Sequence, residues 1–286
     1  MHFKVFKLNY KIIFLFLFIF FLISTICIYT YVLATATTQG IKVPIIMYHS
    51  VLKSRSNTYI VNPSVIENDF KYIKENGYTT ITITDLINYV YNDSPLPEKP
   101  IIITFDDGHY NNLGYVLPLL EKYDMVAVIS IVGKYTDIFS ETDEANLNYS
   151  YLRWKDINEL INTNRIEFQN HTYNLHSNNG KRHGCSKLKG ESIDSYRKVL
   201  SDDILKLQEE FKNNANGYVP NCFTYPYGII SKDSINIIKD LGFKASLSCT
   251  EGVNIISKSP DCLYNLKRFN RTSSISTSQF FKKIFK

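Results

Sequence analysis

Hydrophobic residues along the chain form one long unbroken run and many short ones. The long run covers residues 12–33 and is followed by a short polar stretch. Further on, β-branched apolar runs alternate with segments in which apolar residues recur every three or four positions. The short runs predict buried strands and the periodic segments predict amphipathic helices. Because strands and helices alternate, we expect parallel βα units and an α/β fold.

Seven strands and six helices follow from this pattern. The strands cover residues 42–48, 78–83, 101–107, 126–132, 166–170, 222–225 and 244–248. The helices cover residues 64–75, 85–91, 112–123, 154–161, 192–211 and 231–241. Ser64 and Glu67 are predicted to form a capping box. Residues 136–150 lack an apolar period and are predicted to be a surface insertion. In about 245 residues this favours one distorted (β/α) barrel of about seven parallel strands over two domains.

The long apolar run predicts a transmembrane helix at residues 12–34. Its 22 residues from Ile12 to Leu33, at ~1.5 Å each, match a hydrocarbon core of ~30 Å. A secretory signal has a shorter apolar core of roughly 7–15 residues, although Ala34-Thr35-Ala36 resembles a cleavage site. An uncleaved membrane anchor is therefore favoured, with a removed signal sequence as the alternative.

Both alternatives place the remaining chain outside the cell membrane. Residues 1–11 carry three lysines and no acid, which predicts a cytoplasmic basic tail. Residues 35–41 are predicted to be a linker and residues 42–286 a single extracytoplasmic domain. The protein would be single-pass if the anchor stays and secreted if it is cleaved.

The charge balance argues against nucleic-acid binding. Lys and Arg outnumber Asp and Glu by 32 to 27, and three of those lysines belong to the basic tail. The rest of the chain has 29 basic and 27 acidic residues, and this near balance gives no electrostatic reason to expect a nucleic-acid partner. The predicted domain has four cysteines, which could form two disulfides or stay free: Cys185, Cys222, Cys249 and Cys262. Nothing in the sequence indicates the oligomeric state.

Candidate chemistry gathers at the ends of three predicted strands. The strand at residues 101–107 ends in Asp106-Asp107-Gly108, and carboxylates in such a place need a partner or a metal. The strand at 166–170 leads into His171 and His176, which can converge only across a turn. Two imidazoles and a carboxylate are a usual set for a catalytic zinc-like ion. Alternatively, the aspartates belong to a simple Asp-Gly turn and the histidines to a solvated loop.

A third strand end carries the turn Tyr225-Pro226-Tyr227-Gly228. A backbone N–H in this rigid turn could face a developing oxyanion. Alternatively, the turn only packs the rim of the barrel.

In this order and spacing, Thr-Phe-Asp-Asp-Gly, His-Thr-x-x-x-His and Tyr-Pro-Tyr-Gly resemble the polysaccharide deacetylases of carbohydrate esterase family 4. Supporting matches are Pro44-Ile45-Ile46-Met47-Tyr48-His49, Asn76-Gly77-Tyr78, Leu152-x-Trp154 and Leu266-x-Arg268-Phe269. The resemblance covers roughly residues 42–272. Within the family, the chain resembles the poly-N-acetylglucosamine deacetylase branch.

The resemblance implies a metal-dependent N-deacetylase. Asp107, His171 and His176 would hold one divalent ion, with zinc expected and cobalt, nickel or manganese possible. Asp106 would be the general base, and the backbone N–H of Tyr227 would share the oxyanion. Trp154 would line a cup for the acetyl methyl group. The other substrate contacts would come from Tyr225, Pro226 and Tyr227.

Two departures from the family pattern affect the assignment of roles. Thr224 stands where many members have an arginine that orients the base, and no histidine follows His183 to act as a late general acid. His49 is the remaining candidate for the acid, with a structural rim histidine as its other reading, while His109 and His183 are assigned to the surface. The expected activity is removal of N-acetyl groups from N-acetylglucosamine in an envelope or extracellular glycan. The alternatives are an O-acetyl esterase of the xylan type and a catalytically weak glycan-binding protein.

Overall fold

The computed structural model describes residues 10–38 and 40–285, in two compact units that divide after Gly40. The first unit holds helix α1 (Tyr10–Thr38). Within it, Tyr10–Thr30 is long and apolar enough to cross a membrane. Most of the predicted basic tail, residues 1–9, and residue 39 of the predicted linker lie outside the described residues.

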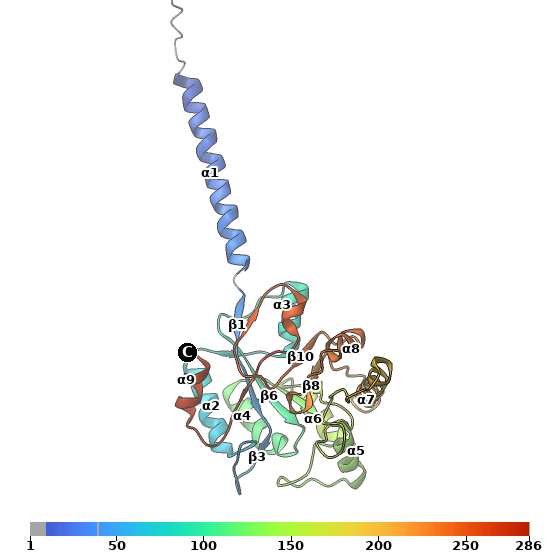
Figure 1. Ribbon diagram of the computed structural model, residues 1–286. Coiled ribbons are helices and arrows are strands. Elements are labelled where there is room, and N and C mark those ends of the chain that lie inside the picture. The colour runs from blue at the N-terminus through green and yellow to red at the C-terminus, as the bar shows by residue number, and fades with distance from the viewer. Residues whose placement is uncertain (1–9, 39, 286) are drawn as a thin grey trace, which may run out of the picture. The chain divides into compact units, whose positions relative to one another are not determined.

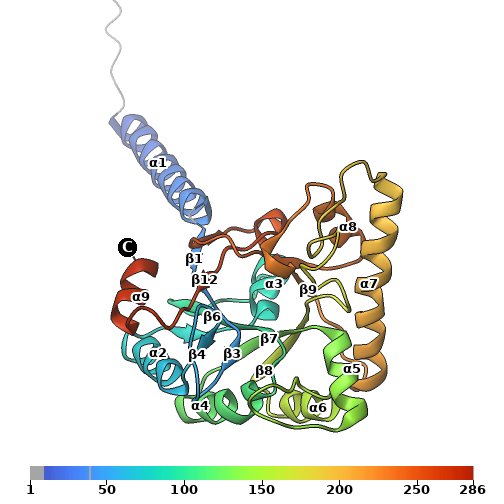
Figure 2. The same cartoon turned by 60° about the horizontal axis from the view of Figure 1, so that its bottom comes forward.

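The second unit, Ile41–Lys286, is organised around a parallel sheet (Figures 1 and 2). Seven strands follow the order β10 (Ala245–Leu247), β9 (Cys222–Thr224), β8 (Ile166–Asn170), β7 (Ala127–Ile131), β6 (Pro100–Asp107), β2 (Ile45–Tyr48) and β12 (Phe269–Asn270). All neighbouring pairs are parallel, and β5 (Thr79–Thr80) adds to the start of β6. Leu266, just before β12, bridges Leu247 of β10, so one segment links the two edges of the sheet. The expected distorted barrel of about seven parallel strands is confirmed.

Helices surround this sheet (Figure 2). They are α2 (Pro63–Glu75), α3 (Ile83–Asn92), α4 (Leu117–Tyr123), α5 (Gly133–Thr142), α6 (Trp154–Asn162), α7 (Ile193–Asn214), α8 (Ser234–Asp240) and α9 (Thr277–Ile284). Short helical turns occur at Asn112–Val116, Pro226–Gly228 and Pro260–Leu263. Two further small ladders join β1 (Ile41–Val43) to β11 (Asn254–Ile256) and β3 (Ser50–Val51) to β4 (Ile60–Val61).

Side chains alternate across the strands and so define an inside and an outside. On β6, Ile101, Ile103 and Phe105 pack against residues of the outer helices. Ile102 belongs to a separate core inside the barrel, which it shares with residues of β2, β7, β9 and β10. Since the side-chain period of a strand is two, Thr104 and Asp106 also face inward. The strand thereby carries one aspartate into the barrel and leaves Asp107 at its mouth.

Two local predictions are wrong. Asn62, not Ser64, caps α2: its Oδ1 accepts from the Ser64 N–H at 3.1 Å, and Pro63 occupies the first helical position, which needs no N–H donor. The predicted insertion at 136–150 begins inside a helix, α5. The buried face of α5 is made of Gly133 and Thr136, so it leaves no apolar period.

The sequence left open whether the cysteines form disulfides or stay free. All five cysteines of the chain are free, so the described residues form no disulfide. Cys185 and Cys222 are buried, while Cys249 and Cys262 are partly exposed.

Candidate active site

Asp106 is held inside the barrel by Arg268. The Arg268 Nη1 donates to Oδ1 at 2.7 Å and Nη2 donates to Oδ2 at 2.8 Å. Both side chains are buried, with 0% of Arg268 and 2% of Asp106 exposed. Burial alone would raise the pKa of Asp106, but the guanidinium outweighs it and lowers that pKa below its ordinary value. Asp106 is therefore a carboxylate at neutral pH, fixed in one orientation.

Arg268 reaches this position through the segment that links the edges of the sheet. Leu266 lies in the inner core and Phe269 in the outer one, so residue 268 falls on the inward face. Thr224, where the family pattern suggested an arginine, instead hydrogen-bonds through its hydroxyl to Ser130 at 2.7 Å. An arginine that orients the aspartate is thus supplied by the segment just before β12.

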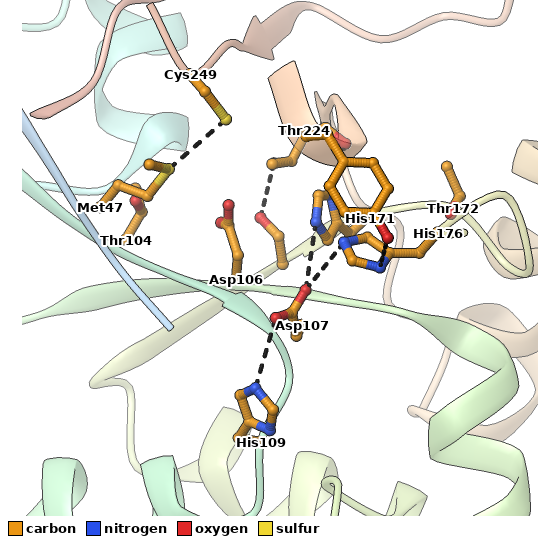
Figure 3. A network of polar contacts seen from close by, with 12 residues as sticks. Met47, Thr104, Asp106, Asp107, His109, His171, Thr172, His176, Thr224 and Cys249 are labelled. Atoms are coloured by element: carbon orange, nitrogen blue, oxygen red, sulfur yellow. Dashed lines mark hydrogen bonds and ion pairs between the residues drawn. The ribbon is translucent and has the colours of Figure 1, made fainter. Parts of the chain in front are cut away.

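Asp107, His171 and His176 converge at the mouth of the barrel (Figure 3). One potential ligand atom from each lies within 4.8 Å of the other two. The Nε2 atoms of His176 and His171 lie 3.2 and 3.6 Å from the Asp107 Oδ1, which is buried and has no hydrogen-bond partner in the described structure. Ligands of a tetrahedral ion bound at about 2.0–2.1 Å stand roughly 3.3 Å apart, and the distances from Asp107 to the two histidines are close to this spacing.

The tautomer of His171 suits metal binding. Its Nδ1 lies 2.7 Å from the carbonyl oxygen of Thr224, which can only accept, so Nδ1 carries the proton and Nε2 offers its lone pair. Burial lowers the pKa of His171 to about 4, which keeps the ring neutral near pH 7.

The turn between the two histidines is fixed from both sides. Thr172 adopts a positive φ of 75°, which is unusual for a β-branched residue, and its N–H donates to Asn170 Oδ1 at 2.9 Å. Asp203 of α7 accepts from the N–H groups of Tyr173 and Asn174, each at 2.8 Å. The turn that the histidine spacing predicted is therefore tied to helix α7 through Asp203, which follows Tyr173 by 30 residues in the chain.

His109 belongs to this site, contrary to its predicted place on the surface. Its Nε2 lies 3.5 Å from the Asp107 Oδ2, and its side chain is 19% exposed. Burial raises the pKa of Asp107, but the neighbouring histidines, His109 foremost, outweigh burial and hold this pKa well below its ordinary value. His183, the other histidine assigned to the surface, is exposed.

A cavity of about 670 Å³ opens over these groups. Its wall includes His49, whose ring meets Tyr59 edge-on with centroids 5.0 Å apart. Burial lowers the pKa of His49, while Asp106 and Asp107 oppose the shift, and its Nδ1 is buried without a partner in the described structure. Further lining residues that the sequence did not single out are Ser50, Arg55, Asn148, Tyr149, Tyr151 and Asn178.

The predicted substrate contacts are only partly brought into this cavity. Tyr227 lines it, with a backbone φ of 57° and its ring 4.6 Å from that of His176. Tyr225 and Pro226 are buried and do not line it. Trp154 also lies away from the wall: it packs edge-on against a core phenylalanine of α7, and its Nε1 donates to Asp137.

Comparison with known proteins identifies the family. A family model described as polysaccharide deacetylase matches residues 93–246, more than half of the chain. The chain belongs to the polysaccharide deacetylase family. Because the match spans β6 to β10, it covers the strand ends that carry Asp106, Asp107, His171 and His176.

Several relatives of this deacetylase family member have curated names. It is 24% identical over 211 residues to the poly-beta-1,6-N-acetyl-D-glucosamine N-deacetylase of Escherichia coli K12, covering 68% of this chain and 31% of that protein. It is 27% identical over 193 residues to the protein of the same name from Staphylococcus aureus MSSA476, covering 68% of this chain and 62% of that protein. The chain therefore spans under two thirds of the length of both relatives.

Solved structures of deacetylases share the fold. A de-N-acetylase from Aggregatibacter actinomycetemcomitans superposes with a TM-score of 0.71 at 20% identity, covering 85% of this chain and 99% of that chain. IcaB from Ammonifex degensii gives a TM-score of 0.68 at 18% identity, covering 86% and 96%. At these identities the likeness establishes the barrel and leaves the chemistry to the residues themselves.

Proposed function

We propose that this protein is a metal-dependent N-deacetylase that removes acetyl groups from poly-N-acetylglucosamine. The observation that carries the proposal is the pairing of two differently held carboxylates. Asp106 is ionised and oriented by Arg268, while Asp107 leaves one buried oxygen beside the Nε2 atoms of His171 and His176. The substrate follows from the names of the E. coli and S. aureus relatives.

The roles of the residues follow from their places. A divalent ion held by Asp107, His171 and His176 would polarise the acetamide carbonyl and acidify a water molecule. Asp106 accepts the proton of the attacking water, since its carboxylate is ionised and faces the same cavity. The backbone N–H of Tyr227 donates to the oxyanion that replaces the carbonyl. Acetate leaves, and the sugar retains an amine.

His49 is the proposed general acid for the departing nitrogen. It lines the cavity that also contains Asp106 and Asp107. Burial lowers the pKa of His49, so an imidazolium formed there gives up its proton readily. The protonated ring would lie in the field of both carboxylates, which favour its charged form.

The glycan-binding alternative loses one of its two arguments. It rested partly on the missing arginine, and Arg268, just before β12, provides the bidentate contact to Asp106. The ester alternative uses the same residues and is separated from amide hydrolysis by substrate alone.

We infer that helix α1 anchors this protein in a membrane. Tyr10–Thr30 is long and apolar enough to span the bilayer, and every residue that lines the cavity lies in the second unit. An extracytoplasmic orientation would bring the site to an exported polymer.

The test is acetate release from N-acetylglucosamine oligomers by the full chain in detergent. The protein would be stripped of metal and then supplied with zinc or cobalt. Metal-restored release that Asp106→Asn abolishes supports the proposal, and we expect His49→Ala to lower kcat by about 10²–10⁴-fold. The matched control is His183→Ala, which changes an exposed histidine. Faster release from an O-acetylated xylan oligomer than from the acetamide would favour the esterase, and no release with any metal would refute the enzyme.

A further inference from the structure

His109 contacts the side of Asp107 that the candidate metal ligands leave free. Oδ1 of Asp107 faces His171 and His176, whereas Oδ2 lies 3.5 Å from the His109 Nε2. Figure 3 shows His109 on the opposite side of the carboxylate from the other two histidines. The group of atoms that could hold one ion contains Asp107, His171 and His176 but not His109. His109 is therefore placed to contact the candidate metal ligand Asp107 rather than to bind the metal itself.

The position of the His109 ring is fixed by its surroundings. The ring packs at a tilt against Tyr151 with centroids 4.8 Å apart, and Tyr151 in turn stacks on Tyr135 at 4.5 Å. The backbones of His109 and Tyr151 form an antiparallel bridge. Hydrogen bonds on either side reinforce it, from the Tyr110 N–H to the Ser150 carbonyl at 2.9 Å and from the Leu152 N–H to the Gly108 carbonyl at 2.8 Å.

The Asp107 carboxylate needs such a partner. Asp107 and Gly108 have φ values of 74° and 79°, so the chain turns sharply just after the ligand. A carboxylate can rotate about its last bond and can offer one oxygen or both to an ion. A neutral imidazole that directs its Nε2–H at Oδ2 would stop this rotation and leave Oδ1 as the single ligand atom. Partners that fix a ligand in this way typically contribute 10–100-fold in metal affinity.

We propose that His109 is a positioning residue that sets the metal affinity of this site by orienting Asp107. The inference rests on the metal site of the proposed function and adds to it a residue outside the ligand set. His109 acts through Asp107, so its removal should change metal binding first and turnover as a consequence.

Direct measurement of zinc affinity tests this inference. The full chain in detergent would compete with a chromophoric chelator for Zn²⁺, and the visible spectrum of its Co²⁺ form would report the ligand geometry. His109→Phe keeps a ring that can stack on Tyr151 but has no N–H, and His109→Gln restores an N–H donor. We expect His109→Phe to weaken Zn²⁺ binding by about 10–100-fold and to alter the Co²⁺ spectrum, with His109→Gln recovering most of the loss.

The controls separate this effect from general damage. His183→Phe makes the same change at an exposed histidine and should bind Zn²⁺ like the wild type. Thermal unfolding of the metal-free variants checks that each folds, and His109→Leu is the second variant should the phenylalanine misfold. Wild-type affinity in His109→Phe, or a wild type that binds no Zn²⁺, overturns the inference. Acetate release by the wild type reports on the proposed function separately, because tight zinc binding without release would refute only that function.

Discussion

The two aspartates at the end of β6 differ because their partners differ. Asp106 faces into the barrel, where the Arg268 guanidinium makes two hydrogen bonds to it, whereas Asp107 faces histidines. A bidentate guanidinium keeps a buried carboxylate charged and oriented, as a general base requires. The Asp107 Oδ1 has no hydrogen-bond donor in the described structure and lies beside two imidazole nitrogens, so it is available as a ligand. The two faces of one strand thus give adjacent residues of one type the different surroundings on which their proposed roles rest.

Replacing Arg268 should therefore impair the base rather than the metal site. Arg268→Lys keeps the positive charge but loses the two-pronged contact, and we expect kcat/KM to fall on the order of 10²-fold. Arg268 lowers the pKa of Asp106 against the effect of burial, so weakening the pair raises that pKa. A base works only when deprotonated. As the pH is lowered, the variant should therefore lose activity at a higher pH than the wild type does.

A buried pair elsewhere in the barrel supplies the control for Arg268→Lys. Arg271 binds Asp69 through Nε at 2.6 Å, both side chains are buried, and neither lines the cavity. Arg271→Lys should lower the melting temperature without moving the pH profile of kcat/KM. An unchanged profile in Arg268→Lys would show that Arg268 serves stability alone.

At the residue scale, the sequence was informative where a motif lies on one strand end. The predicted ligands Asp107, His171 and His176 do converge, because parallel strands bring their carboxyl ends to one edge. Arg268 was noticed only as a family match, since its contact to Asp106 joins residues 162 apart. His109 was assigned to the surface because nothing local shows that the chain folds back against Tyr151.

Among the elements, α7 holds the turn that carries the proposed metal ligands His171 and His176. Asp203 accepts from two successive backbone N–H groups of this turn, at Tyr173 and Asn174. The Asn170 Nδ2 also donates to the carbonyl of Ile204, at 3.1 Å. The helix thereby holds the chain on both sides of His171, and the separation of the two histidines depends on its position.

Asp203→Ala should consequently loosen His176. We expect Zn²⁺ affinity to fall by about 10–100-fold, as for other partners that position metal ligands. Unfolding free energy should fall by about 1–3 kcal/mol, because two N–H groups lose their acceptor. Chelator competition and denaturant unfolding measure the two effects. The neighbouring Asp202, which is 62% exposed and pairs with Lys198, provides the control variant Asp202→Ala, and equal affinities in the two variants would contradict this role.

Elements with a regular apolar pattern were well predicted, and those built on small or polar residues were not. The strand β7 lies within the predicted residues 126–132, because its short apolar run reflects burial. The helix α5 was missed because Gly133 and Thr136 form its buried face. At Gly133 a Cβ atom would lie 2.7 Å from Leu207 of α7, so this close approach excludes the larger side chains that would have revealed the helix.

For the whole molecule, the division after Gly40 separates the candidate membrane helix from the cavity. All lining residues fall between Met47 and Asn270, and the second unit begins with β1. β1 pairs with β11 over three residues, from Ile41 opposite Ile256 to Val43 opposite Asn254. Val43 is fully buried in the inner core. We therefore expect the domain to need its first three residues and the site to be independent of the helix before them.

Two truncations test this division together with the anchor proposal. The chain from Gly40 onward should be soluble without detergent and should keep the kcat/KM of the full chain on short oligomers, whereas the full chain should remain with the membrane fraction. The chain from Pro44 onward differs by four residues but lacks β1, so it exposes the edge of β11 and loses the buried Val43. We expect it to unfold at lower denaturant concentration, since deleting a buried valine alone costs about 1.5–3 kcal/mol. Protein recovered from the medium with Thr37 as its N-terminus, directly after Ala34-Thr35-Ala36, would identify a cleaved signal instead. Equal stability of the two truncations would contradict the role of β1.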